Sequence, residues 1–137
     1  MKQRELKFRL WDDVLKVMYT PEMNEEVPNL WSIPESKGGI VKYAHGVLMQ
    51  FTGLTDSSGA EWFEGDIIAL NNEYEEEDDD TKAIIVFEWG AFRIQYIEAG
   101  KPFEQDGHKV NAGSIKPLDL RMFTVIGNIY ENPELLN

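Results

Sequence analysis

Apolar and polar residues alternate with a period of two along most of this chain, while helical spacing of apolar residues is almost absent. The segment 6–19 contains two alternating runs, 6–11 and 14–19, which are separated by Asp12 and Asp13. Alternation of this kind is typical of β-strands with one buried and one solvated face. We therefore predict an N-terminal β-hairpin that turns at the two aspartates, although the glycine usual in such turns is missing.

The second half of the chain shows the same pattern more regularly. Asp, Ser and Gly residues, which favour turns, separate the runs, and Trp89 and Gly90 join the two clearest of them into a second hairpin. The predicted strands lie at 47–52, 61–63, 67–70, 83–88, 91–97 and 122–130, followed by a single helical turn at 133–136. We interpret Gly53, Gly59 and Gly65 as turn residues, because no phosphate-binding motif surrounds them.

Pro and Gly residues interrupt two long segments, 20–40 and 98–117, which are predicted to be loops with at best one helical turn near 22–26. Strands of about five or six residues suit a small closed barrel better than a flat sheet, because closure leaves no exposed edge. We therefore predict a mainly β chain with little helix. Residues 1–46 would form the hairpin and a Pro/Gly-rich loop, and residues 47–137 the barrel, within one domain.

The chain is strongly acidic, with 25 Asp and Glu against 13 Lys and Arg and a formal net charge of −12. Seven of the acids fall within 73–80, and without them 18 acids stand against 13 bases. Like charges in a block repel one another, so this run is predicted to be a solvated loop. Two alternatives stay open for this run. One is a calcium site, although the run lacks the glycine and the alternating ligands of the usual calcium loop. The other is an acidic segment that binds a basic partner, including by mimicry of nucleic-acid phosphate.

The excess of Asp and Glu over Lys and Arg argues against nonspecific binding of DNA or RNA, because phosphate contacts need clustered Lys and Arg. The chain has no cysteine, which removes disulfides, thiolate metal sites and cysteine nucleophiles. No apolar run approaches the ~18 residues of a membrane span, and the polar start resembles no signal peptide. We therefore expect a cytoplasmic protein without a membrane partner.

Residues that could carry chemistry are scattered and form no recognisable motif. His45 and His108 each lie beside a glycine in a predicted loop, and Ser57, Ser58 and Ser114 lack the framing of a nucleophile elbow. The histidines also lack the spacing of a metal-binding helix. We therefore predict no catalytic residue, no cofactor and no metal site, and expect that the chain is not an enzyme. A metal-assisted enzyme built on carboxylates stays open as an alternative.

The remaining candidates for a functional role are the four tryptophans, Trp11, Trp31, Trp62 and Trp89. Many of the Tyr and Phe residues fall on alternating positions that core packing explains. Trp31 lies in the Pro-rich loop and Trp89 at a turn, where exposed side chains would create an interaction surface. Packing of one loop over the barrel is the interpretation that we favour for these tryptophans, and a candidate interaction surface for a protein partner, made of all four, is the alternative.

Three segments in chain order, 4–12, 48–68 and 125–136, together resemble the YopX family of bacteriophage and prophage proteins. They carry the sequences RELKFRLWD, LMQFTGLTD with a following EGDII, and VIGNIYENPELL. The resemblance implies a mostly β fold with an SH3-like barrel and a phage or prophage origin, but no reaction and no catalytic residue. The acidic run and the Trp-containing loop depart from the family pattern. The glycines that we interpret as structural turns in the matched segments are Gly53, Gly59, Gly65 and Gly127.

Our first hypothesis is a non-enzymatic accessory protein of a phage or prophage, acting in the cytoplasm of the bacterial host through protein–protein contacts or as a homo-oligomer. The surplus of aromatic residues and strand edges, beside the lack of a catalytic motif, favours it. The second hypothesis is a nucleic-acid-related role, by mimicry of DNA charge or by direct binding. Direct binding would use the one dense basic cluster, which consists of Lys2, Arg4, Lys7 and Arg9.

Overall fold

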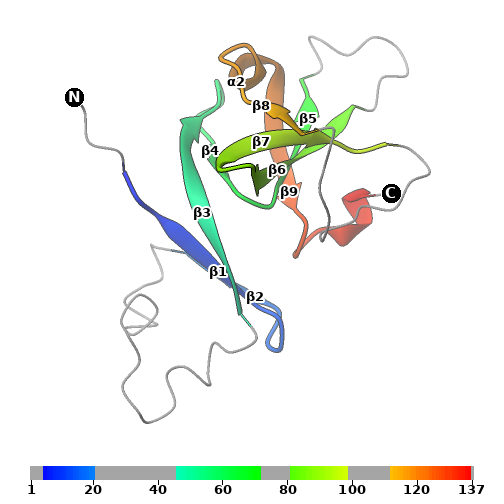
Figure 1. Ribbon diagram of the computed structural model, residues 1–137. Coiled ribbons are helices and arrows are strands. Elements are labelled where there is room, and N and C mark those ends of the chain that lie inside the picture. The colour runs from blue at the N-terminus through cyan, green and yellow to red at the C-terminus, as the bar shows by residue number, and fades with distance from the viewer. Residues whose placement is uncertain (1–4, 21–45, 72–80, 99–111, 137) are drawn as a thin grey trace. The chain divides into compact units, whose positions relative to one another are not determined.

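A computed structural model describes residues 5–20, 46–71, 81–98 and 112–136 of the chain. The chain divides into two compact units, Met1–Gln50 and Phe51–Asn137. The boundary falls inside the long strand β3 (Gly46–Thr55), so this strand contributes residues to both units. Figure 1 shows that the described elements of both units are nearly all strands.

The described residues of the first unit form a small antiparallel sheet. Strand β1 (Phe8–Asp12) lies between β2 (Val17–Tyr19) and the first half of β3. Leu10 is the cross-strand partner of Tyr19 in the first pairing and of Leu48 in the second. The N-terminal β-hairpin predicted from the alternation is thereby confirmed.

The Asp12 carboxylate closes the turn of this hairpin. Its Oδ1 accepts hydrogen bonds from the backbone amides of Val14 and Leu15, each at 2.9 Å. Lys16 takes the left-handed conformation, with a φ of 56°, in which a glycine is more usual. An aspartate that mimics a backbone turn and one residue at positive φ therefore replace the missing glycine.

The second unit contains a five-stranded antiparallel sheet in the order β8-β7-β6-β5-β9, which curls into a half-barrel (Figure 1). Separately, the second half of β3 pairs with β4 (Glu61–Phe63), with a shift of register between Phe51 and Thr55. Gly53, which we predicted to be a turn residue, instead lies inside β3 at this irregularity, where its φ is 84°. The predicted mainly β fold with little helix is confirmed, and its curled sheet is a half-barrel. The five strands of the curled sheet are β5 (Asp66–Leu70), β6 (Lys82–Glu88), β7 (Ala91–Tyr96), β8 (Ala112–Ser114) and β9 (Phe123–Asn128).

The hydrophobic core of the second unit covers one face of the curled sheet. Cross-strand pairing puts Ile68 beside Ala83, and Ile85 beside Ile94, and none of these side chains is more than 2% exposed. Trp62 of β4 joins them with no exposed surface at all. Burying the ~200 Å² of an indole at about 25 cal/mol per Å² corresponds to roughly 5 kcal/mol of gross transfer free energy. The buried members of the cluster are Trp62, Ile68, Ala83, Ile85, Ile94 and Phe123.

The structure also contains short elements that the alternation does not predict. Strand β8 lies inside the predicted loop 98–117, and the one-turn helix α2 (Asp119–Met122) comes directly before β9. The predicted C-terminal turn is present as the 3-10 helix η2 (Pro133–Leu136). Nearly all of the predicted loop 20–40, with its helical turn, and the acidic run 73–80 lie outside the described residues.

Candidate functional site

The candidate surface of tryptophans does not exist as predicted, because two of its members are core residues. Trp62 has no exposed surface and Trp11 is only 6% exposed. Trp89 is 70% exposed, and Trp31 lies outside the described residues. Alternation shows that a strand has two faces but not which face the fold covers, so it could not separate these residues. Among the described tryptophans, Trp89 alone is exposed.

The turn after β3 is built around the buried carboxylate of Asp56. Its Oδ1 accepts hydrogen bonds from the amides of Ser58 (2.9 Å) and Ala60 (3.2 Å) and from the Ser58 hydroxyl, and its Oδ2 accepts one from the indole Nε1 of Trp62 (2.9 Å). Burial raises the pKa of Asp56, but the hydrogen bonds from Ser58, Trp62 and Ala60 outweigh it, so the pKa lies below its ordinary value. The carboxylate is therefore ionised and fully engaged in holding Trp62 and the turn.

The turn at Gly65 and Asp66 links three parts of the second unit. Asp66 Oδ2 accepts the amide hydrogen of Phe63 at 2.7 Å, as expected for a carboxylate that caps a tight turn. Gly65, at a φ of 88°, donates its amide to the carbonyl of Ile85 (2.8 Å) and accepts from the amide of Ile129 (3.0 Å). This glycine therefore ties β4, β6 and the segment after β9 together through its backbone.

The segment after β9 is held by a compact set of asparagine contacts. Asn128 Oδ1 accepts from the amides of Tyr130 (3.1 Å) and Glu131 (2.8 Å), while its Nδ2 donates to Glu131 Oε1 (2.9 Å). Asn132 Oδ1 accepts from the amide of Asn128 at 3.2 Å. Gly127, which we predicted to be a turn residue, instead lies inside β9, where a Cβ would meet Asn132 Oδ1 at 2.5 Å. Close approach, and not a turn, is what requires glycine there.

The other residues that could act in catalysis or metal binding do not form a site among the described residues. His45 and His108 lie outside them, Ser57 and Ser114 are exposed on separate elements, and Ser58 donates its hydroxyl to Asp56. No group of three or more His, Cys, Asp or Glu side chains within the described ranges is placed to hold a metal ion. No helix in the described part of the chain is long and apolar enough to cross a membrane.

The basic cluster at the N-terminus is only partly described. Lys2 and Arg4 lie outside the described residues, and Lys7 Nζ lies 3.4 Å from Glu5 Oε1. A carboxylate therefore lies beside the cluster at Lys7, which lowers the local positive charge available to a phosphate.

The β6–β7 hairpin ends in three aromatic side chains, Phe87, Trp89 and Phe92, which we call the hairpin tip. Trp89 and Gly90 form its two-residue turn, with φ angles of 54° and 75°. Phe87 and Phe92 are cross-strand partners whose rings meet edge to face, with centroids 5.1 Å apart. Phe87 is 51% exposed and Trp89 70%. The hairpin tip is thus an ordered aromatic surface that is open to solvent.

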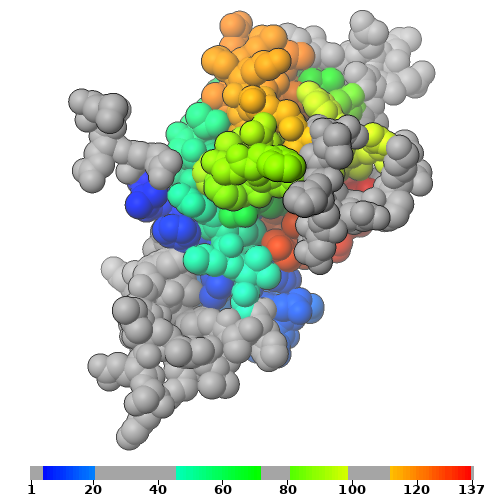
Figure 2. Space-filling view, viewed as in Figure 1, coloured from blue at the N-terminus to red at the C-terminus, as the bar shows by residue number. Residues whose placement is uncertain are grey.

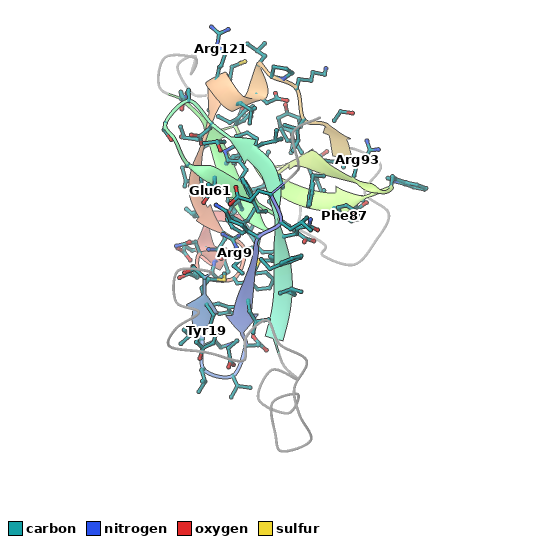
Figure 3. All side chains as sticks on the ribbon, turned by 90° about the vertical axis from the view of Figure 1, so that its left-hand side faces the viewer. Arg9, Tyr19, Glu61, Phe87, Arg93 and Arg121 are labelled. Carbon is teal, nitrogen blue, oxygen red and sulfur yellow. The ribbon has the colours of Figure 1, made fainter. Side chains whose placement is uncertain are left out.

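The hairpin tip stays exposed because the neighbouring strands do not follow the hairpin to its end. Strand β5 pairs with β6 as far as Ile84, and β8 pairs with β7 only from Arg93 onward. Phe87 nevertheless shares its face of β6 with the buried Ile85, so the apolar face of the hairpin continues past the core. Figure 3 shows Phe87 and Arg93 on opposite sides of the projecting hairpin, and Figure 2 shows β7, in yellow-green, at the surface.

Sequence reasoning placed Trp89 at this turn but missed the aromatic pair beside it. The alternation puts Phe92 on the same face of its strand as Ile94, and it does not separate Phe87 from the core positions of β6. One local signal could have revealed the surface: the two-residue turn reads Trp-Gly, where hairpins prefer Asn-Gly or Asp-Gly.

A sequence model described as "YopX protein" matches residues 7–137 of the chain. The chain belongs to the YopX family. None of the curated proteins compared with it matches.

Two solved structures resemble this YopX-family chain along almost its whole length. Protein EF1440 from Enterococcus faecalis is 27% identical, with a TM-score of 0.57, and the match covers 98% of this chain and 100% of that one. Protein yopX from Bacillus subtilis is 17% identical, with a TM-score of 0.52, and the match covers 96% of this chain and 95% of that one. The second likeness concerns the fold alone.

The segments that resemble the YopX family build the framework of the second unit. Segment 48–68 supplies Asp56, Gly65 and Asp66, and segment 125–136 supplies the asparagine contacts that hold the C-terminal end. These polar groups are engaged with the backbone and with the core tryptophan. The hairpin tip belongs to neither segment, so the framework and the exposed aromatic surface are separate features of this YopX chain.

Proposed function

We propose that this YopX-family protein is a non-enzymatic accessory protein of a phage or prophage that docks its hairpin tip on another protein in the cytoplasm of the bacterial host. The phage origin rests on the family resemblance. The non-enzymatic character is supported by the buried carboxylates of Asp56 and Asp66, whose hydrogen bonds hold turns and the core. The docking surface is supported by the conformation of Trp89.

Trp89 is the observation that carries the proposal. A two-residue hairpin turn with positive φ at both positions favours Asn and Gly, because a bulky side chain at positive φ is strained by about 1–2 kcal/mol. Trp89 adopts this conformation with 70% of its surface exposed, so burial does not offset most of that strain. A bulky aromatic residue that stays mostly exposed at positive φ supports a function in contact with another molecule.

The chemistry of the hairpin tip suits a protein contact. Tryptophan is enriched among the few interface residues that dominate binding, and truncating such a residue typically costs about 2 kcal/mol or more of binding free energy. The Phe87–Phe92 pair extends the apolar surface beside it, held on the rigid hairpin by cross-strand pairing. The tip therefore combines an anchor side chain with an ordered apolar support.

Trp89→Asn separates this function from folding. Asparagine suits positive φ, so the free energy of unfolding should stay unchanged or rise by about 0.5–1 kcal/mol. Proteins that co-purify with the tagged wild-type chain from the cells that naturally produce it should be lost with the variant. Chemical denaturation followed by circular dichroism gives the first quantity, and quantitative mass spectrometry of co-purified proteins gives the second.

Leu15→Ser provides the matched control. Leu15 is 58% exposed in the turn of the other hairpin, so its replacement removes a similar apolar group from a different surface. The control variant should retain the partners of the wild-type chain. The proposal is wrong if Trp89→Asn keeps the same partners, or if it destabilises the chain by more than about 1 kcal/mol, which would make Trp89 a structural residue.

A further inference from the structure

The net negative charge of the chain belongs entirely to the unit that carries the hairpin tip. Residues 1–50 contain seven acids and seven bases, whereas residues 51–137 contain 18 acids and six bases. The described part of 51–136 alone holds nine carboxylates and four basic side chains. Lys82 donates to the carbonyl of Leu135 (2.8 Å) and Arg93 Nε to the carbonyl of Glu88 (2.9 Å), and both side chains keep their positive charge. The aromatic tip is therefore presented on an electronegative unit.

We infer that the hairpin tip binds a basic segment of its partner protein, with an arginine or lysine side chain stacked on the indole of Trp89. This inference rests on the proposed function and names its partner class. Tryptophan has the most favourable ring for a cation, and the contact strengthens as the pair leaves water. The Phe87–Phe92 pair offers an apolar surface for the aliphatic stems that carry such charges.

The negative charge of the second unit also acts on β7, at the end of the strand away from the hairpin tip. Burial and, after it, the negative charge of Asp119 raise the pKa of Tyr96, which lies on the same strand as Phe92. Tyr96 lies at the opposite end of β7 from the hairpin tip, so the attraction of a cation to the tip comes from the net charge of the second unit. Screening shortens the reach of this attraction to about 10 Å at 0.1 M salt, so binding of a basic segment should weaken as salt rises.

The same charge disfavours the other occupants of an exposed aromatic surface. Two copies of this chain would each bring a unit of 18 acids against six bases to the contact. Phosphate groups of nucleic acids and of anionic lipids would be repelled as well. A basic protein segment is the occupant for which the charge and the aromatic surface both contribute attraction.

Charge selectivity and dependence on Trp89 can be measured together with the full-length protein. The probes are the labelled peptide acetyl-(Arg-Ala)4-amide and its neutral isostere, in which citrulline replaces each arginine. Fluorescence anisotropy at 50 and 300 mM NaCl gives the affinities of wild-type protein, Trp89→Asn and the control Leu15→Ser. We expect the wild type to bind the arginine peptide at least about tenfold more tightly than the citrulline peptide at 50 mM NaCl, and the difference to shrink at 300 mM.

Trp89→Asn should weaken binding of the arginine peptide by about fivefold or more, and Leu15→Ser by less than about twofold. Equal affinity of wild type and Trp89→Asn would overturn the inference, because the acidic residues alone would then attract the peptide. Equal affinity for the two peptides would overturn it as well, as would sedimentation showing that wild-type protein self-associates through Trp89. If Trp89→Asn loses its cellular partners while the peptides are not distinguished, the proposed function stands and the basic partner class is wrong.

Discussion

Asp56→Ala is expected to lower the free energy of unfolding by about 3 kcal/mol. The substitution removes the acceptor for the amides of Ser58 and Ala60 and for the indole of Trp62. A buried donor left without an acceptor costs about 1–3 kcal/mol, and Trp62 has no exposed surface at which water could replace the carboxylate. Urea denaturation followed by circular dichroism measures the change.

Asp13→Ala is the control for this substitution. Asp13 also lies in a turn, but it is exposed and pairs with Lys16 at the surface, so its loss should cost less than about 1 kcal/mol. In the Trp62→Phe background, Asp56→Ala should cost at least about 1 kcal/mol less than in the wild type, because the indole donor is already absent. The structural role of Asp56 would be refuted by a loss no greater than that of Asp13→Ala.

The same carboxylate should make stability depend on pH in the acid range. Folding lowers the pKa of Asp56 below the ordinary value of 3.8, so the folded chain binds this proton less readily than the unfolded chain. The stability that Asp56 contributes is therefore fully present above about pH 3.8 and is lost as the pH falls through the lowered pKa. The stability difference between wild type and Asp56→Asn should narrow on acidification, which denaturation at a series of pH values measures.

Gly127→Ala is expected to lower the free energy of unfolding by about 2 kcal/mol. The added Cβ would lie 2.5 Å from Asn132 Oδ1 and 3.0 Å from Asn132 Cβ, so Asn132 must move. Asn132 cannot move freely, since its side-chain Oδ1 accepts the backbone amide of Asn128 (3.2 Å) and its backbone amide donates to the carbonyl of Asn128 (2.9 Å). The substitution therefore combines overpacking with a weakened hydrogen bond.

Gly113→Ala tests whether close approach is the cause. Gly113 also lies in a strand, but no atom lies within 4 Å of the position that its Cβ would take. Its replacement should change the free energy of unfolding by less than about 0.5 kcal/mol. Gly127→Ala combined with Asn132→Ala should cost less than the sum of the two single changes, because the obstructing side chain is gone. Equal effects of the two glycine substitutions would contradict this reading of β9.

Local patterns were sufficient to predict both hairpins and the C-terminal turn. Strand alternation, Asp12 and the Trp89–Gly90 pair are all close in sequence, so the contacts that define these elements form within a few residues. Strand β8 could not be predicted in this way. Its three residues, Ala-Gly-Ser, show no alternation, and it becomes a strand only through pairing with β7, which is distant in the chain.

The candidate site was only partly predictable for the same reason. The sequence shows that Trp62 lies on a strand, but only the fold shows that its indole reaches the Asp56 carboxylate. It shows a glycine at 127 but not that the chain after β9 folds back and brings Asn132 against it. The exposure of Trp89 followed from its place in a two-residue turn, whereas that of Phe87 depends on where β5 stops pairing with β6.

Site-specific photo-crosslinking tests the central claim most directly, because it reports what touches residue 89 in the cell. Trp89 is replaced by p-benzoylphenylalanine in the full-length chain, with the same replacement of Leu15 as the control, and the cells that naturally produce the protein are irradiated. The account predicts a discrete adduct of residue 89 with another protein, through a peptide rich in Arg or Lys, and no such adduct from residue 15. The same adducts from both positions, or none from residue 89, would contradict it.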